Sequence, residues 1–281
     1  MRGRWLLEQG WERMLFAHWR VDPAALRRLL PRGVEPDLGC GGAWVGIVAF
    51  VMTGTRSALS PRLPVLPPIP ELNVRTYVRV GGEPGVWFLT LDASSPLFVS
   101  VGRALYGLNY RRARMLVVPD GEATHYASVA GRAAFSACYR PSGESRLPPP
   151  ESTEHFLVER YRLFAERHGV VVTAEVEHEP WRLHDAAAEI SLNRMAPPGL
   201  RLDGEPLLHF SAGVRARIST PVPVRRLRPV TPGNSSGNRR KETHEHRHDP
   251  DHRPARPADP RLLRPRSLSR IALSATRRRH T

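Results

Sequence analysis

The sequence is almost devoid of lysine: Lys241 is the only lysine among 42 lysines and arginines in 281 residues. Lysine is the side chain that forms Schiff bases with carbonyl substrates, and arginine cannot replace it because its guanidinium stays protonated. We predict that the folded domain covers residues 1–222, which contain no lysine. Catalysis through a lysine amine is therefore excluded for that domain.

The chain also has few cysteines and no long apolar run. Cys40 and Cys138 form no CxxC pair, so we expect two free thiols in a reducing cytoplasm, with a disulfide between them as the alternative. No stretch reaches the roughly 18–20 apolar residues that cross a bilayer. The N-terminal segment also lacks the apolar core of a signal peptide. We expect a cytoplasmic protein with no membrane partner.

Aromatic residues are missing from residues 225–281, which hold 16 of the 42 basic and 5 of the 27 acidic residues. Such a composition cannot bury enough apolar surface to offset its ordering entropy. We therefore predict that residues 223–281 form a disordered tail rich in arginine, proline and histidine. Residues 225–281 also carry +11 of the formal net charge of +15. The domain surface is thus of mixed charge, unlike a phosphate-binding face.

The tail leaves two alternatives open. The alternative function is nucleic-acid binding through the arginines of the tail. The domain itself carries no recognised nucleic-acid motif, so we expect no nucleic-acid contact from it. A shifted reading frame is the alternative origin of the tail. We expect no specific metal site and no cofactor, because no folded shell would surround the tail histidines. The closely spaced histidines that could meet a metal there are His244, His246, His248 and His252.

Residues 1–222 are rich in strand patterns. Residues 12–20 alternate Met14, Phe16 and His18 with apolar residues of the other face, which predicts a strand with His18 in the core. Residues 43–52 are apolar on both faces, as in a fully buried strand. We predict helices over residues 23–33, 96–108 and 153–168, and further strands over residues 72–80, 86–92, 113–118, 124–130, 133–139, 170–177, 188–192 and 207–214. This order predicts an α+β fold, in which a curved, mostly antiparallel sheet closes to a barrel-like or cone-shaped body with a few flanking helices.

One predicted strand carries an unusual polar face. Because strands have a period of two, Glu71, Asn73, Arg75 and Tyr77 share one side of it. On a solvent-facing side this is an ordinary amphipathic edge strand, whereas inside a barrel it forms a pocket wall of the kind that ligand sites have. Glu71 and Arg75 lie about 13 Å apart along a strand, so each needs another partner or a ligand.

Several segments together resemble a known family. They are WERMLFAHW at 11–19, the helix pattern at 22–31, AWVGIVAF at 43–50, PELNVRTYV at 70–78 and GLNYRRARM at 107–115. In combination they are similar to the uncharacterised DUF2071, or YqjF-like, family over roughly residues 5–220. The resemblance implies the acetoacetate decarboxylase-like fold, a closed or cone-shaped sheet around an internal cavity. It favours the interior position for the polar face.

Acetoacetate decarboxylase works through a Schiff-base lysine that this domain lacks, so the resemblance does not imply that reaction. We predict a domain that binds, or acts on, a small carboxylate or other anionic molecule. Arg75 would hold the anion and Glu71 is the candidate catalytic acid or base. The GLNYRRARM segment is either a solvated basic turn or a cavity rim that attracts acidic molecules. The predicted ligand-binding residues are Glu71, Asn73, Arg75, Tyr77, Tyr110 and Arg111.

Overall fold

The computed structural model describes residues 4–58 and 66–224. All of them belong to one compact unit. Almost all of the predicted tail, including His244, His246, His248, His252 and Lys241, lies outside the described residues.

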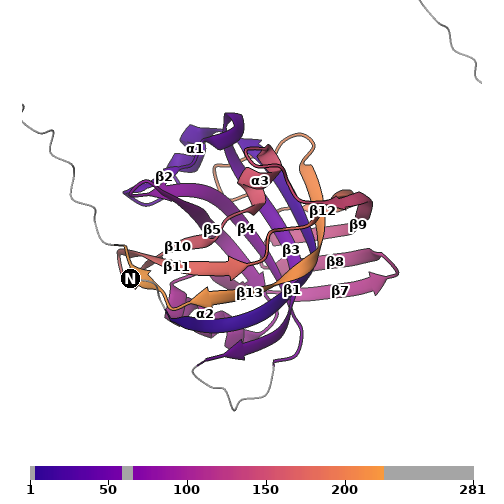
Figure 1. The fold of residues 1–281 in the computed structure, drawn as a ribbon, viewed down its shortest axis with the longest axis horizontal. Helices are drawn as coiled ribbons and strands as arrows, with labels where there is room; N and C mark the ends of the chain where they lie inside the picture. Colours follow the sequence, from indigo (N-terminus) through magenta and orange to yellow (C-terminus); the bar gives the residue numbers. More distant parts are fainter. Residues whose placement is uncertain (1–3, 59–65, 225–281) are drawn as a thin grey trace, which may run out of the picture. The chain divides into compact units, whose positions relative to one another are not determined.

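Seven strands form a closed barrel. In ring order they are β1 (Trp5–Val21), β3 (Ala43–Ser57), β4 (Ile69–Val80), β5 (Glu83–Ala93), β10 (Arg162–Arg167), β11 (Val170–His178) and β13 (Leu207–Ser219). Strand β13 pairs with both β11 and β1, and this double pairing closes the ring (Figure 1). Every pairing in the ring is antiparallel except that of β10 with β5. The predicted fold class is confirmed.

A second group of strands extends the sheet from β13. It consists of β12 (Leu183–Asn193), β9 (Ala133–Arg146), β8 (Ala123–Ala130) and β7 (Arg114–Asp120), which run beyond the barrel in Figure 1. Three short strands complete the sheet: β2 (Val34–Pro36) beside β4, β6 (Tyr110–Arg112) beside β5, and β14 (Val222–Pro223) beside β11.

The strands separate two hydrophobic cores, as the alternation in β1 predicted. Met14 and Phe16 belong to the core inside the barrel. Leu15 and Ala17 belong to a core on the outer face, which includes Tyr126 and Phe135 of the extension. The extension therefore packs on the barrel wall and buries its outer apolar side.

Three α-helices and one 3-10 turn lie within the described ranges. They are α1 (Pro23–Arg27), the turn η1 (Gly39–Gly41), α2 (Pro96–Tyr106) and α3 (Thr153–Val158). Asp22 caps α1 by accepting from the backbone N–H groups of Ala24 and Ala25. Helix α2 lies at one end of the barrel, and α1 and α3 lie at the other (Figure 1). No helix in the described part is long and apolar enough to cross a bilayer.

The prediction of a helix over residues 153–168 is wrong. Helix α3 ends at Val158, and β10 begins at Arg162. Strand β10 pairs with β5 and β11, so it fills a place in the ring that would otherwise leave two edges unpaired. Leu163 lies in the inner core and Phe164 in the outer one, which is the period of a strand. Tertiary pairing here overrides the helical spacing of the apolar residues.

Gly213 is a position where the fold requires glycine. Its φ is +142°, and a Cβ there would lie 2.1 Å from the backbone oxygen of Trp11 in the paired strand β1. We expect Gly213→Ala to lower the free energy of unfolding by about 3 kcal/mol, because the two backbones must separate. Urea denaturation followed by circular dichroism measures this change.

Gly143→Ala is the matched control. Gly143 also has a positive φ, +70°, but the space around its Cβ position is open. We expect only the cost of a left-handed alanine there, about 1–2 kcal/mol. Equal losses in the two variants would contradict a steric requirement at Gly213.

Candidate functional site

The barrel encloses a cavity of about 400 Å³. Small-molecule sites of this size class are mostly apolar and contain a few convergent polar groups. The lining fits that description, since aliphatic and aromatic side chains of β1, β5 and α2 form much of the wall. The polar side chains that line it are Gln9, Thr55, Arg56, Ser57, Glu71, Arg75, Tyr106, Tyr110, Arg160 and His178.

Strand β4 supplies two of the charged groups. Glu71, Arg75 and Tyr77 lie on the inner side of the barrel, whereas Leu72 and Val74 of the same strand pack in the outer core. Glu71 pairs with Ala93, just before α2, and Arg75 pairs with Phe88 further along β5. The cavity therefore extends along β4 from the α2 end, past Glu71, to Arg75.

Arg75 is half-buried in the cavity wall. Its Nη2 donates to the carbonyl oxygen of Leu157 at 3.0 Å, and its guanidinium lies 5.5 Å from the ring centre of Phe16. None of the ion pairs within residues 4–58 and 66–224 includes Arg75. Its Nε is buried without a hydrogen-bond partner in that part of the chain. The wall thus holds a cation that lacks a protein counter-charge among the described residues.

Glu71 is buried, with 4% of its surface exposed. Tyr110 donates its hydroxyl to Oε2 of Glu71 at 2.7 Å, and Asn73 also hydrogen bonds to this carboxyl group. Burial raises the pKa of Glu71 from 4.5 to about 7; the two hydrogen bonds oppose the rise and the charge of Asp92 adds to it. Near neutral pH the carboxyl group therefore populates both protonation states.

Tyr77 and Asn73 support these groups and are not among the lining residues. The Tyr77 hydroxyl donates to the carbonyl oxygen of Leu157 at 2.7 Å and lies 2.7 Å from Nε2 of His18. Burial and the nearby Arg75 hold the pKa of His18 well below its usual value, so this histidine is neutral. It is a core residue, as predicted.

Arg111 lies apart from the other predicted site residues and is not among the residues lining the cavity. Neighbouring side chains of β6 point to opposite sides, so Tyr110 faces inward and Arg111 does not. The Nε of Arg111 donates to Oδ1 of the fully buried Asp92 at 2.7 Å, and Ser128 donates to the other carboxyl oxygen at 3.1 Å. Arg111 therefore balances a buried charge within the protein.

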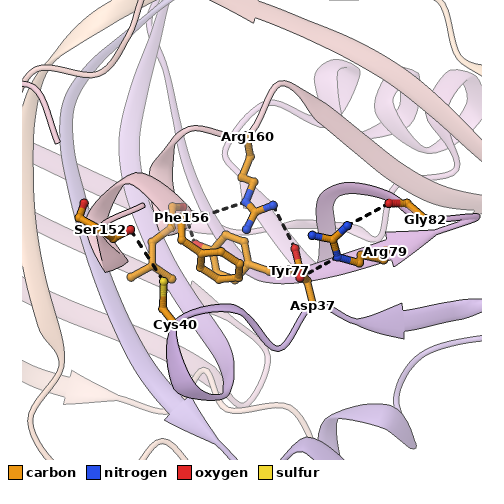
Figure 2. Close-up of polar contacts among 9 residues, drawn as sticks. Asp37, Cys40, Tyr77, Arg79, Gly82, Ser152, Phe156 and Arg160 are labelled. Carbon is orange, nitrogen blue, oxygen red and sulfur yellow. Dashed lines mark hydrogen bonds and ion pairs between the residues drawn. The ribbon is translucent and has the colours of Figure 1, made fainter. Parts of the chain in front are cut away.

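The end of the barrel opposite α2 is closed by a cluster around Asp37. Figure 2 shows Asp37 between two guanidinium groups, with Nη1 of Arg160 at 3.1 Å and Nε of Arg79 at 3.0 Å. The guanidinium of Arg160 stacks over the ring of Phe156 at 4.1 Å. Arg160 also lines the cavity, so Arg75 and Arg160 both face it at this end. The buried carboxylate of Asp37 is shared between Arg160 and Arg79.

The sequence did not single out Arg160, His178 and Trp181, although all three line the cavity. Arg160 falls within the predicted helix over residues 153–168, and His178 lies just beyond the predicted strand over residues 170–177. Trp181 stacks on Trp11 with ring centres 6.2 Å apart, a contact between residues distant in sequence. A tryptophan in the sequence of a strand-rich domain is a weak signal of a pocket, but the sequence does not show on which face of the sheet its side chain lies.

In the part of the chain described here, no three histidine, cysteine or acidic side chains gather in a way that could hold a metal ion. Cys40 and Cys138 are both free thiols. Cys40 donates weakly to the carbonyl oxygen of Ser152 at 3.8 Å, beside the Asp37 cluster (Figure 2). The ionisable groups of the cavity are therefore organised around Arg75 and Glu71.

Solved structures similar to this chain share its fold. The enduracididine biosynthesis enzyme MppR in complex with pyruvate gives a TM-score of 0.60 at 15% identity, covering 79% of this chain and 91% of MppR. Acetoacetate decarboxylase from Legionella pneumophila gives a TM-score of 0.56 at 14% identity, covering 78% of this chain and 87% of that enzyme. The barrel thus has the acetoacetate decarboxylase-like fold.

The sequence has a nearer relative. This chain is 38% identical over 214 residues to the uncharacterized protein YqjF of Bacillus subtilis. The matched region covers 74% of this chain and 88% of YqjF. Residues 8–215 match DUF2071, a family described as an uncharacterized conserved protein. The chain therefore belongs to the DUF2071 family.

Proposed function

We propose that this protein binds a small carboxylate, or a related small anion, inside the barrel, with Arg75 as the counter-ion. The observation that carries the proposal is the guanidinium of Arg75 in a cavity wall, outside every ion pair between described residues. A half-buried cation without a counter-charge destabilises a fold, and a bound anion removes that cost. Guanidinium groups match the planar geometry of a carboxylate.

The surrounding charges support Arg75 as the anchor. Arg160 adds positive charge at the same end of the cavity, but its Nη1 already bonds to Asp37 at 3.1 Å. Arg56 also borders the cavity, yet it is exposed, so water screens its charge. Attraction of an anion to Arg75 is stronger because the nearby wall is apolar and excludes water.

We assign Glu71 the role of an acid or base beside the bound anion. With a pKa of about 7, its carboxyl group can give or take a proton at neutral pH, which suits general acid–base chemistry. Tyr110 fixes its orientation through the 2.7 Å hydrogen bond. Asn73 and Tyr77 take supporting roles, since one bonds to Glu71 and the other to the Leu157 carbonyl that also binds Arg75.

The proposed chemistry does not pass through an imine. The single lysine, Lys241, belongs to the C-terminal segment outside the described residues. MppR, which shares the fold, has been solved in complex with pyruvate, a carboxylate. That complex supports a carboxylate ligand for this barrel through fold similarity, while the lysine count argues against covalent attachment.

Arg75→Met should remove the preference for an anion. We expect wild-type protein to bind hexanoate about 10- to 100-fold more tightly than hexan-1-ol, the range expected for a charge-assisted hydrogen bond. The variant should bind the two compounds about equally. Isothermal titration calorimetry with both compounds measures the difference.

Two further variants keep that test interpretable. Arg112→Met removes an exposed arginine of β6 that forms no ion pair among the described residues, and it should leave the preference unchanged. Arg75→Lys keeps the positive charge and should retain part of the preference even if Arg75→Met folds poorly. An unchanged preference for hexanoate in a folded Arg75→Met protein would refute the proposal.

Glu71→Gln should change how stability depends on pH. The folded-state pKa of about 7 exceeds the usual value of 4.5, so the folded protein binds an extra proton between these values. Stability from Glu71 is therefore complete below pH 4.5 and is lost as pH rises through 7. Between pH 4.5 and 8 the free energy of unfolding should fall by about 3 kcal/mol more in wild type than in the variant. Urea titrations at several pH values measure it, and parallel curves would show that Glu71 titrates normally.

A further inference from the structure

We infer that the ligand is an amphipathic monocarboxylic acid, with its carboxylate at Arg75 and a medium-length alkyl or aryl body that extends towards α2. The inference rests on the proposed function and adds the class of ligand. Three features of the cavity carry it: its volume, the position of its charged groups and the apolar surface that α2 contributes.

The volume exceeds what a very small acid needs. The cavity of about 400 Å³ corresponds to roughly a dozen water-sized volumes, at about 30 Å³ for each water. An acid as small as pyruvate would occupy less than half of this space. The remaining space would be empty or filled with water against an apolar wall, and neither arrangement is favourable.

The charged anchor lies at one end of this space. Arg75 donates to Leu157 of α3, whereas α2 begins three residues after Ala93, the register partner of Glu71. The four residues from Arg75 back to Glu71 span about 13 Å of strand. A ligand with its carboxylate at Arg75 therefore places its body alongside Glu71 and its far end near α2.

The side chains that α2 turns to the cavity are mostly apolar, although Arg56 and Ser57 also line the cavity next to Leu7 of β1. Phe98, Val101 and Leu105 lie on the cavity side of the helix, and Leu6 and Leu7 of β1 also line the space. The apolar surface continues outward, since Leu97 and Val101 line the cavity and are also 64% and 37% exposed. An exposed apolar rim on a soluble helix is consistent with an entry route for an apolar group.

The two tyrosine hydroxyls that line the cavity have partners within the protein. The hydroxyl of Tyr110 donates to Glu71 at 2.7 Å, and that of Tyr106 donates to the carbonyl oxygen of Ser219 at 3.1 Å. Because these hydroxyl groups already donate to protein acceptors, neither is free to donate to a ligand. A ligand meets this part of the wall through apolar contact. Recognition there depends on apolar burial.

Calorimetric titration of the full-length protein with straight-chain acids tests the inference. Butanoate, hexanoate, octanoate and decanoate are compared with pyruvate and with the matched primary alcohols. Each added methylene group should tighten binding by roughly fourfold until the cavity is full, because burial of a methylene is favourable by a nearly constant amount. Every acid should bind more tightly than its alcohol.

The ligand class and the proposed role of Arg75 are contradicted by different outcomes. If all acids, including pyruvate, bind equally, the apolar body is wrong and the proposed function stands. If acids and alcohols of equal length bind equally, the proposed role of Arg75 is wrong. If no acid binds at millimolar concentration, both are wrong.

Val101→Ser tests the contribution of α2 directly. Octanoate should bind about tenfold more weakly to this variant, since a buried valine contact is lost, while binding of pyruvate should not change. Val129→Ser is the matched control, because Val129 is 38% exposed, lies on β8 and does not line the cavity. Equal octanoate affinity in the two variants, both shown to be folded by circular dichroism, would overturn the placement of the ligand body at α2.

Discussion

The carbonyl oxygen of Leu157 accepts hydrogen bonds from both Arg75 and Tyr77, at 3.0 and 2.7 Å. This shared acceptor ties α3 to the inner wall of β4 and so closes one end of the barrel. It also fixes the Arg75 guanidinium at the edge of the cavity, where the side chain would otherwise be free to turn. The closed end, the cavity and the position of its cation therefore depend on one backbone group at the last turn of α3.

The cavity contains two groups that disfavour folding, one a cation and the other a carboxyl group. Arg75 is a cation without an ion-pair partner in the described part of the chain, and Glu71 is a carboxyl group whose pKa is raised to about 7 by burial. An apolar pair of similar volume would stabilise the barrel more. Departures from stabilising chemistry concentrate at functional sites, so this pair supports the proposed site more strongly than the cavity volume does.

The sequence predicted what depends on the period of a strand and missed what depends on pairing between distant strands. Alternation in β1 and β4 correctly separated the inner from the outer residues, so Glu71 and Arg75 were predicted on one face and both line the cavity. Arg111 was grouped with Tyr110 because they are adjacent, but adjacent residues of β6 face opposite ways. Residues 153–168 carry a helical spacing, yet residues 162–167 form the strand β10 because it fills the place between β5 and β11. The cavity role of Arg160 was hidden by that error.

The near-absence of lysine shapes what this barrel can bind. An imine holds a small keto acid covalently, so an enzyme that forms one does not depend on contact area for retention. Without that bond, affinity must come from the ion pair and from apolar burial. A single charge-assisted contact contributes about 1.5–3 kcal/mol, which is less than millimolar binding requires. Burial of an alkyl or aryl body is the remaining source, and the apolar wall between Arg75 and α2 provides it. The missing amine and the apolar cavity thus favour the same class of ligand.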